Sequence, residues 1–265
     1  MKRIQGIVLV FFILTIKAYP GWILTVENYD TDNQEKRSHK VYFQENRIKI
    51  VDPDLTTIFD LNQNMITFLK PQIHMFWKGT VEDYLKEVRE TFELMIDLEV
   101  KKLPEEKQDE AKRTFETMMR IMEHPDTASA LDIFIRETAE KDTILGYETA
   151  KFQVFLNGVI IEDLWISGKL DVSRDLDQSK YLYLLSQLST GFENELVYQA
   201  AAEYKHLIYN TYILRTKEYK IGYQTVKEVV DMRQEALDES VFLPPPDYKP
   251  VTLTELGIIA MDNQQ

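Results

Sequence analysis

The chain has 265 residues, of which 44% are hydrophobic and 28% charged, with 9 Gly and 9 Pro. This composition is typical of a folded globular protein and excludes disordered and fibrous chains. The 31 basic against 44 acidic residues give a formal net charge of −13, which disfavours binding to nucleic-acid phosphates. The chain has no cysteine, so disulfides, thiol nucleophiles and Cys-ligated metals are excluded as well.

The N-terminus has the layout of a secretory signal peptide. Met1, Lys2 and Arg3 form a basic start, residues 7–16 are apolar apart from Thr15, and Ala18 follows. We therefore expect residues 1–18 to be removed, with Gly21 as a second cleavage candidate, and the protein to be periplasmic or extracellular. An uncleaved anchor and a buried N-terminal segment are the alternatives, but the apolar run is shorter than the about 20 residues that span a bilayer. No transmembrane anchor is then expected after processing.

Residues 22–78 are predicted to form an antiparallel meander. Short runs with alternating apolar residues are separated by turn-forming residues at 52–54, 62–64 and 70–71. The runs are 22–29, 41–43, 48–50, 58–61, 65–69 and 73–77.

Residues 80–140 are predicted to be a helical insert. Thr80 with Asp83 three residues later is typical of a helix N-terminus, and Pro104 suits the first turn of a second helix. A third short helix is expected near 128–139. One apolar stripe follows the first helix: Val81, Tyr84, Leu85, Val88, Phe92, Met95 and Ile96.

The remainder is predicted to return to strands. Asn157-Gly158 between two apolar runs indicates a hairpin over residues 146–167, followed by helix over 178–209 and strands over 212–218 and 223–233. The prolines at 244–250 should close a single domain that spans residues 19–250, and 251–265 should be a tail. This order of elements predicts an α+β fold with a mainly antiparallel sheet.

No residue set in the sequence has the spacing of a catalytic or metal site. The four histidines lack the spacing of metal ligands, and no serine lies in a hydrolase motif. Asp171, Asp175 and Asp177 suggest either a calcium loop or helix-capping acids, and the missing Gly and Glu of a calcium loop favour capping. We therefore predict no catalytic residue, no metal and no cofactor.

The strand rhythm resembles that of the LolA/LolB-like superfamily of exported bacterial proteins, especially its branches of unknown function. The resemblance is carried by residues 41–52, 57–61, 68–77, 146–154, 159–165 and the ending Phe242, Pro245 and Tyr248. It implies a curved, mainly antiparallel sheet, an open half-barrel, with helices packed on its concave face. It also implies an apolar cavity of the kind that carries lipoprotein acyl chains, while the lack of cysteine departs from members with a lipid anchor.

On this basis we expect an exported, non-enzymatic protein that holds a lipid, a lipoprotein acyl chain or an apolar protein segment between sheet and helices. The alternatives are a structural or interaction domain with a self-filled core, in which the methionines are ordinary packing, and a hydrolase with no recognisable motif. The candidate ligand-binding residues are Phe43, Ile50, Phe68, Met75, Trp77, Phe92, Met95, Met118, Met122, Phe152 and Val154.

The predicted signal peptide is tested by the start of the exported chain. We expect N-terminal sequencing of protein recovered from the periplasm or medium to begin near Tyr19. A sequence that begins at Met1 would contradict the cleavage, and cell fractionation would then separate an anchored from an intracellular protein.

Overall fold

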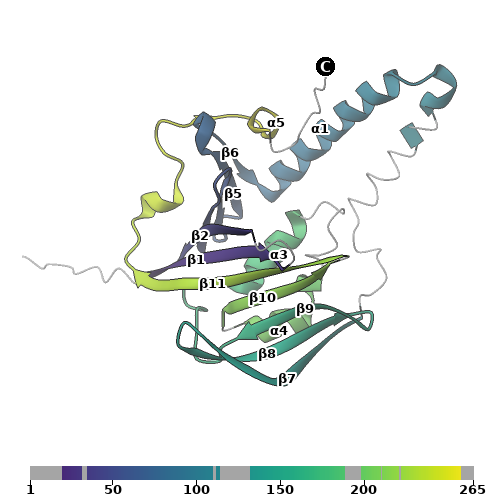
Figure 1. The fold of residues 1–265 in the computed structure, drawn as a ribbon. Coiled ribbons are helices and arrows are strands. Elements are labelled where there is room, and N and C mark those ends of the chain that lie inside the picture. Colours follow the sequence, from purple (N-terminus) through teal and green to yellow (C-terminus); the bar gives the residue numbers. More distant parts are fainter. Residues whose placement is uncertain are drawn as a thin grey trace, which may run out of the picture.

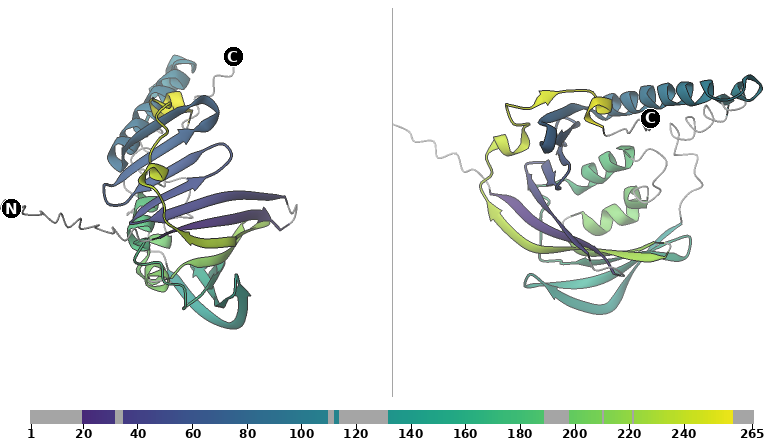
Figure 2. Two further views of the ribbon diagram at one scale, coloured as in Figure 1. Left: turned by 90° about the vertical axis from the view of Figure 1, so that its left-hand side faces the viewer. Right: turned by 45° about the horizontal axis from the view of Figure 1, so that its top comes forward.

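The structure is a computed structural model that describes residues 20–31, 35–109, 112–113, 132–188, 198–209, 211–220 and 222–257. Its main feature is one 12-stranded sheet with the order β12-β6-β5-β4-β3-β2-β1-β11-β10-β9-β8-β7. Neighbouring strands are antiparallel except β12 and β6. The sheet is open and curved, which confirms the predicted α+β class with a curved sheet (Figures 1 and 2).

The first half of the sheet is the predicted meander. Its alternating sequence places one apolar face toward the helices, and the turn between β2 and β3 uses Glu45 and Asn46, both with positive φ (50° and 61°), as a tight hairpin requires. The strands are β1 (Gly21–Asp30), β2 (Lys36–Gln44), β3 (Arg47–Val51), β4 (Thr56–Asp60), β5 (Met65–Lys70) and β6 (Met75–Thr80), with the turn η1 (Pro71–Ile73) before β6.

The second half of the sheet joins the first through β1 and β11, whose residues pair from Gly21 with Glu235 to Asp30 with Thr225. The hairpin at Asn157-Gly158 is confirmed, and both residues have positive φ (51° and 76°). The strands are β7 (Ile133–Ile144), β8 (Tyr147–Leu156), β9 (Val159–Ile166), β10 (Ile213–Lys220) and β11 (Tyr223–Glu235).

The third helix predicted over 128–139 is wrong where the structure describes it, because residues 133–144 form β7. Ile133 and Ile135 pair with β8 and pack in the core beside Val154. Both side chains are two residues apart, as strand alternation requires, and pairing with a neighbouring strand rather than local helix propensity decides the structure here. The helical insert therefore ends before residue 132 rather than at 140.

Two helices occupy the hollow of the sheet (Figure 2). They are α3 (Gln178–Leu188) and α4 (Ala202–Ile208), preceded by the turn η3 (Tyr198–Ala200), all within the predicted helical range 178–209. Leu182 and Leu184 of α3 and Ile208 of α4 are buried against the sheet. The core thus lies between the concave face and these helices.

The helix α1 (Val81–Lys101) begins as predicted, because the Asp83 carboxylate accepts from the Thr80 N–H and the Thr80 hydroxyl accepts from the Asp83 N–H. Val81 and Val88 pack into the core, whereas the C-terminal part of α1 extends beyond the sheet (Figure 1). Within the described residues, no helix is both long and apolar enough to cross a membrane.

The predicted tail starts too early, because residues 251–257 belong to the packed fold. After the turn η4 (Glu239–Phe242), β12 (Lys249–Pro250) pairs with β6, and α5 (Leu253–Leu256) buries both of its leucines. The Glu87 carboxylate accepts from the Trp77 indole at 2.7 Å and from the Leu253 N–H at 2.9 Å. This link holds α5 on α1 and β6; residues 258–265 lie outside the described part.

The pairing of β1 with β11 predicts that the protein unfolds as one unit. The chain has 3 tryptophans, Trp22 on β1, Trp77 on β6 and Trp165 on β9. We expect single-tryptophan variants, with Phe at the other two positions, to show the same denaturant midpoint by fluorescence as by circular dichroism. A separate transition for Trp165, or two stable halves after limited proteolysis, would show that the two parts of the sheet fold independently.

Candidate functional site

A cavity of about 250 Å³ lies between the concave face of the sheet and the helices α3 and α4. Its wall combines β1, β2, β3, β9, β10 and β11 with η3 and both helices. The lining residues are Val26, His39, Val41, Phe43, Ile48, Ile50, Glu162, Leu176, Gln178, Tyr181, Leu182, Leu185, Gln199, Tyr204, Ile208, Tyr212, Ile213, Leu214, Thr216, Glu218, Lys227 and Val229.

Most of this wall is apolar and is a direct result of strand alternation. Side chains two apart on a strand share a face, so Val41 and Phe43 of β2 and Ile48 and Ile50 of β3 all point to the concave side. Phe43 is fully buried and stacks on Tyr212, with ring centroids 5.7 Å apart. This part of the cavity suits a hydrocarbon chain.

A polar patch crosses the same wall on three adjacent strands. We define it as Glu162 on β9, Thr216 and Glu218 on β10, and Lys227 on β11. Glu218 is directly opposite Glu162, and Thr216 is directly opposite Lys227. The cavity therefore has an apolar wall and a polar patch, as an amphipathic ligand requires.

Glu162 is the most unusual member of the polar patch, because it is a carboxyl group with 1% exposure. It accepts hydrogen bonds from the hydroxyls of Tyr198 (3.1 Å) and Tyr204 (3.2 Å). Burial, and secondarily the charge of Glu218, raise its pKa to about 8, although both tyrosine hydrogen bonds act in the opposite direction. Burial and the Glu162 charge also raise the pKa of both tyrosines, so these hydroxyls remain donors.

Glu218 remains ionised beside Glu162. Burial alone would raise its pKa, but the positive charges of Lys227 and Lys220 and their contacts at 2.7 and 3.4 Å lower it instead. The hydroxyl of Thr216 is buried and has no hydrogen-bond partner among the described residues. The polar patch therefore holds one paired carboxylate, one neutral carboxyl group and one unused hydroxyl.

His39 is the one histidine on the cavity wall within the part of the chain that the structure describes. Burial lowers its pKa, and the carboxylate of Asp52, 3.8 Å from Nδ1, opposes that effect only in part. The imidazole is thus neutral at neutral pH and adds a polar but uncharged group to the wall.

The structure divides the predicted ligand-binding residues among three places. Phe43 and Ile50 line the cavity. Four others belong to the same core cluster as Phe43 but do not line the cavity: Phe68 of β5, Met75 and Trp77 of β6, and Phe92 of α1. Phe152 and Val154 pack near α4, and the side chain of Met95 and the residues Met118 and Met122 lie outside the described residues.

The sequence prediction missed the helices that face the cavity. The candidate residues Phe92, Met95, Met118 and Met122 placed the predicted helical insert 80–140 against the cavity, whereas the described cavity is covered by α3, η3 and α4. Glu162 was also missed, although it had a recognisable pattern: Glu162 and Asp163 interrupt an otherwise apolar strand whose side chains are mostly buried.

The three aspartates that suggested calcium have structural roles. Asp177 accepts from the Lys180 N–H in the first turn of α3, which supports the capping interpretation for this residue. Asp171 accepts from the Ser173 N–H in a turn that precedes α3. Asp175 is instead buried and accepts from the Trp22 indole at 3.0 Å. No cluster of potential metal ligands is found among the described residues.

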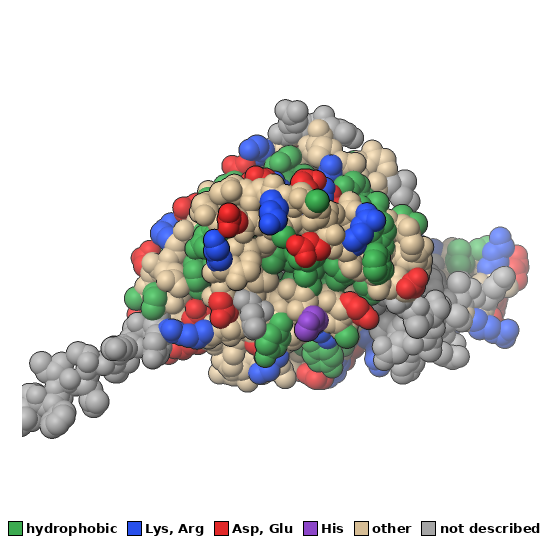
Figure 3. Space-filling view, turned by 90° about the horizontal axis from the view of Figure 1, so that it is seen from below, with side chains coloured by type: hydrophobic (Ala, Val, Ile, Leu, Met, Phe, Trp, Pro, Cys, Tyr) green, Lys and Arg blue, Asp and Glu red, His purple; other side chains and the backbone are tan. Residues whose placement is uncertain are grey.

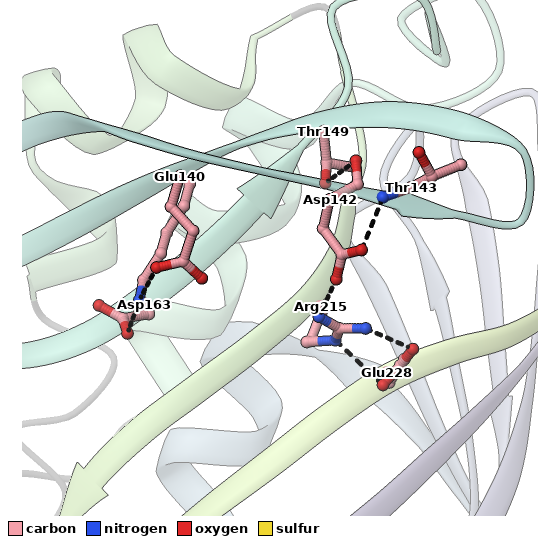
Figure 4. Close-up of polar contacts among 8 residues, drawn as sticks. Glu140, Asp142, Thr143, Thr149, Asp163, Arg215 and Glu228 are labelled. Carbon is pink, nitrogen blue, oxygen red and sulfur yellow. Dashed lines mark hydrogen bonds and ion pairs between the residues drawn. The ribbon is translucent and has the colours of Figure 1, made fainter.

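The outer face of the sheet carries ion pairs rather than a cavity. Arg215 bridges Asp142 at 2.7 Å and Glu228 at 2.9 Å, and Lys151 bridges Asp163 and Glu140 (Figure 4). Charges of both signs are scattered among apolar side chains on the face seen from below Figure 1 (Figure 3). The pairs of Lys151 and the pair of Arg215 with Glu228 connect neighbouring strands, whereas the pair of Arg215 with Asp142 joins β10 to β7. No charge of one sign dominates that face.

Two further hollows lie on the surface, and most of the residues that line them are polar or charged. One of about 370 Å³ is lined by Glu137, Lys141, Asp142, Thr143, Glu148, Thr149, Ala150, Ile166, Gly168 and Lys169. The other, of about 500 Å³, is lined by Lys78, Asp83, Lys86, Glu87, Glu90, Thr91, Leu94, Thr252 and Thr254.

Comparisons with known proteins give a loose structural likeness. No protein-family model matches the chain, and no curated protein matches it. Solved structures that resemble it include PNGF-II (10% identity, 89% of this chain, 32% of that chain, TM-score 0.38). A chain of the Pseudomonas aeruginosa MucA/MucB complex is also similar, with 10% identity over 88% of this chain and 59% of that chain and a TM-score of 0.38. The chain thus spans about a third of PNGF-II and less than two thirds of the MucA/MucB chain.

The expected resemblance is also found among these structures. A LolA superfamily protein from Nitrosomonas europaea is 8% identical, with 85% of this chain and 90% of that chain covered at a TM-score of 0.27.

The raised pKa of Glu162 predicts a specific pH dependence of stability. Its pKa is about 8 in the folded protein against an ordinary value of 4.5, so the folded state holds an extra proton between these values. The stabilisation that the protonated Glu162 contributes to the folded state is complete below the ordinary pKa of 4.5 and is lost as the pH rises through the folded-state pKa of about 8. From about pH 5 to about pH 8, we expect the free energy of unfolding of the wild type to fall by up to about 1.4 kcal/mol per pH unit relative to that of Glu162→Gln.

Denaturant unfolding at several pH values measures this difference. Glu148→Gln is the matched control, because it removes an exposed carboxylate whose ordinary titration lies below this pH range. Parallel pH profiles for the wild type and Glu162→Gln would show that Glu162 is not protonated in the folded protein.

Proposed function

We propose that the protein binds a small amphipathic molecule, with its hydrocarbon chain between the concave face and the helices α3 and α4. The observation that carries this proposal is the cavity of about 250 Å³, whose walls are mostly apolar but include the polar patch. A chain in this cavity would exchange water contacts for contacts with Phe43, Ile50 and Leu185, which is favourable.

The size of the cavity narrows the ligand class. Ligand pockets generally measure about 300–1,000 Å³, so this cavity of about 250 Å³ lies just below the usual range. It suits one lipid or acyl chain better than a folded protein element, and an apolar protein segment is the competing ligand. The proposed role is non-enzymatic, as expected from the sequence.

The proposed setting is outside the cytoplasm. It rests on the signal-peptide pattern of residues 1–18, which lie outside the described residues. A protein that sequesters a hydrocarbon chain allows an insoluble molecule to cross an aqueous compartment, and this matches the expectation from the LolA-like resemblance.

A cavity-filling substitution tests the binding site. Leu185 lines the cavity and packs against buried core residues on both sides of it, so Leu185→Trp should occupy the space of the ligand. We expect it to lower the affinity for the neutral dye Nile red at least about tenfold and to reduce lipid found by mass spectrometry after native purification. Leu98→Trp on α1, where Leu98 is 47% exposed, is the matched control and should change neither result.

Three outcomes would contradict the proposal. Wild-type protein that neither co-purifies with lipid nor binds the dye saturably would support the self-filled structural domain. Equal dye affinity in wild type and a folded Leu185→Trp variant would place the dye elsewhere. Co-purification of a peptide instead of a lipid would identify the apolar protein segment as the ligand.

A further inference from the structure

The polar patch contains a buried acid with no basic partner. Among the described residues, no Lys, Arg or His nitrogen forms an ion pair with Glu162, whose partners are the hydroxyls of Tyr198 and Tyr204. The nearest positive charge on the wall, Lys227, is bonded to Glu218 at 2.7 Å. An unpaired buried carboxyl group is costly for folding, and here it lies on a cavity wall.

The hydroxyl of Thr216 is a second unused group on the same wall. Its Oγ1 atom is buried and has no partner among the described residues. Thr216 and Glu162 are diagonal neighbours across β10 and β9, because Thr216 is opposite Leu164 and Glu218 is opposite Glu162. Diagonal neighbours on one face are close enough for one small group to contact both.

The charges around Glu162 and Thr216 favour some ligand head groups over others. Glu162 and Glu218 face each other, whereas one lysine, Lys227, lies on the wall and is paired. A carboxylate or phosphate head group would add a further negative charge beside two acids. An ammonium group supplies a positive charge and three N–H donors, for which the Glu162 carboxylate and the Thr216 hydroxyl are acceptors.

The aromatic side chains of the wall agree with a cation. Tyr204, Tyr181, Tyr212 and Phe43 line the cavity, and the rings of Tyr198 and Tyr204 are 5.7 Å apart beside Glu162. The faces of such rings attract a cation that has lost its water shell.

We propose that the ligand is a cationic amphiphile whose protonated amine is bound by Glu162 and Thr216 while its hydrocarbon chain lies along the apolar wall. This inference rests on the function proposed above and names its ligand class.

Binding of a cation in this position would remove the proton from Glu162. The groups that face Glu162 are Glu218 of β10, Lys227 of β11, and Tyr198 and Tyr204 of η3 and α4, and His39 of β2 lies on the same cavity wall. With a Glu162 pKa of about 8 in the empty cavity, each binding event below that pH releases one proton. The affinity for the cation should therefore rise about tenfold per pH unit toward pH 8 and then level off.

Three ligands with the same chain test the head group: dodecylamine, dodecanol and dodecanoate, each below its micelle concentration and measured by displacement of Nile red. An alkylammonium has a pKa similar to the about 10.4 of lysine, so it stays charged throughout. At pH 8 we expect the amine to bind at least about tenfold tighter than the alcohol, and dodecanoate to bind most weakly. At about pH 6 the advantage of the amine over the alcohol should largely disappear.

Substitutions assign this preference to the polar patch. Glu162→Gln keeps an oxygen acceptor for both tyrosines, and it should remove the preference for the amine and its pH dependence while dodecanol still binds. Thr216→Val keeps the shape of the side chain but removes its hydroxyl, so it should weaken the binding of dodecylamine more than that of dodecanol. Glu148→Gln replaces an exposed glutamate in the same way and should change neither the affinity for dodecylamine nor its pH dependence. This variant controls for adsorption of cations to an acidic protein.

The results distinguish the two proposals. Equal binding of amine and alcohol, with no effect of Glu162→Gln in a folded protein, would overturn the head-group assignment and leave the cavity proposal intact. If none of the three ligands displaces the dye, and Leu185→Trp has no effect on the dye, the cavity proposal itself fails.

Discussion

The antiparallel pairing of β1 with β11 is the constraint on which the rest of the structure depends. It connects two runs of strands that are far apart in the sequence, and Val26 of β1 lies opposite Val229 of β11 on the cavity wall. Without this pairing the chain has two smaller sheets, each with one exposed apolar face. With it, twisted neighbouring strands form one curved surface, and the apolar side chains of both halves converge on the same hollow.

The helices α3 and α4 fill only part of the hollow of the sheet, and the cavity is the space that they leave. Leu182 and Leu184 of α3 and Ile208 of α4 are buried on the sheet, so the helices supply most of the packing that the concave face needs. At one place the sheet presents Glu162, Thr216, Glu218 and Lys227 instead of apolar side chains. These residues cannot pack as hydrocarbon does, and the space beside them stays open to a ligand that completes their hydrogen bonds.

The sequence allowed the strands to be predicted better than the helices that cover them. Alternation and the Asn157-Gly158 turn are local features, and they identify β2, β3, β8 and β9 correctly. Which helix lies on which face is decided by the pairing order of the strands, a long-range property that a single sequence does not contain. Phe43 and Ile50 were therefore identified as cavity residues, whereas Leu182, Leu185 and Tyr204 were not.

Glu162 illustrates how a site differs from a core. Buried ionisable groups are seldom retained for stability, since apolar residues of similar volume often stabilise a protein more. The hydroxyls of Tyr198 and Tyr204 reduce the cost of burying this carboxyl group, but they supply no positive charge that would allow it to ionise at neutral pH. Glu218 lies directly opposite and makes its ionisation harder still. A residue that opposes folding in this way, on the wall of a cavity and next to an unused hydroxyl, is accounted for when a ligand supplies the missing positive charge.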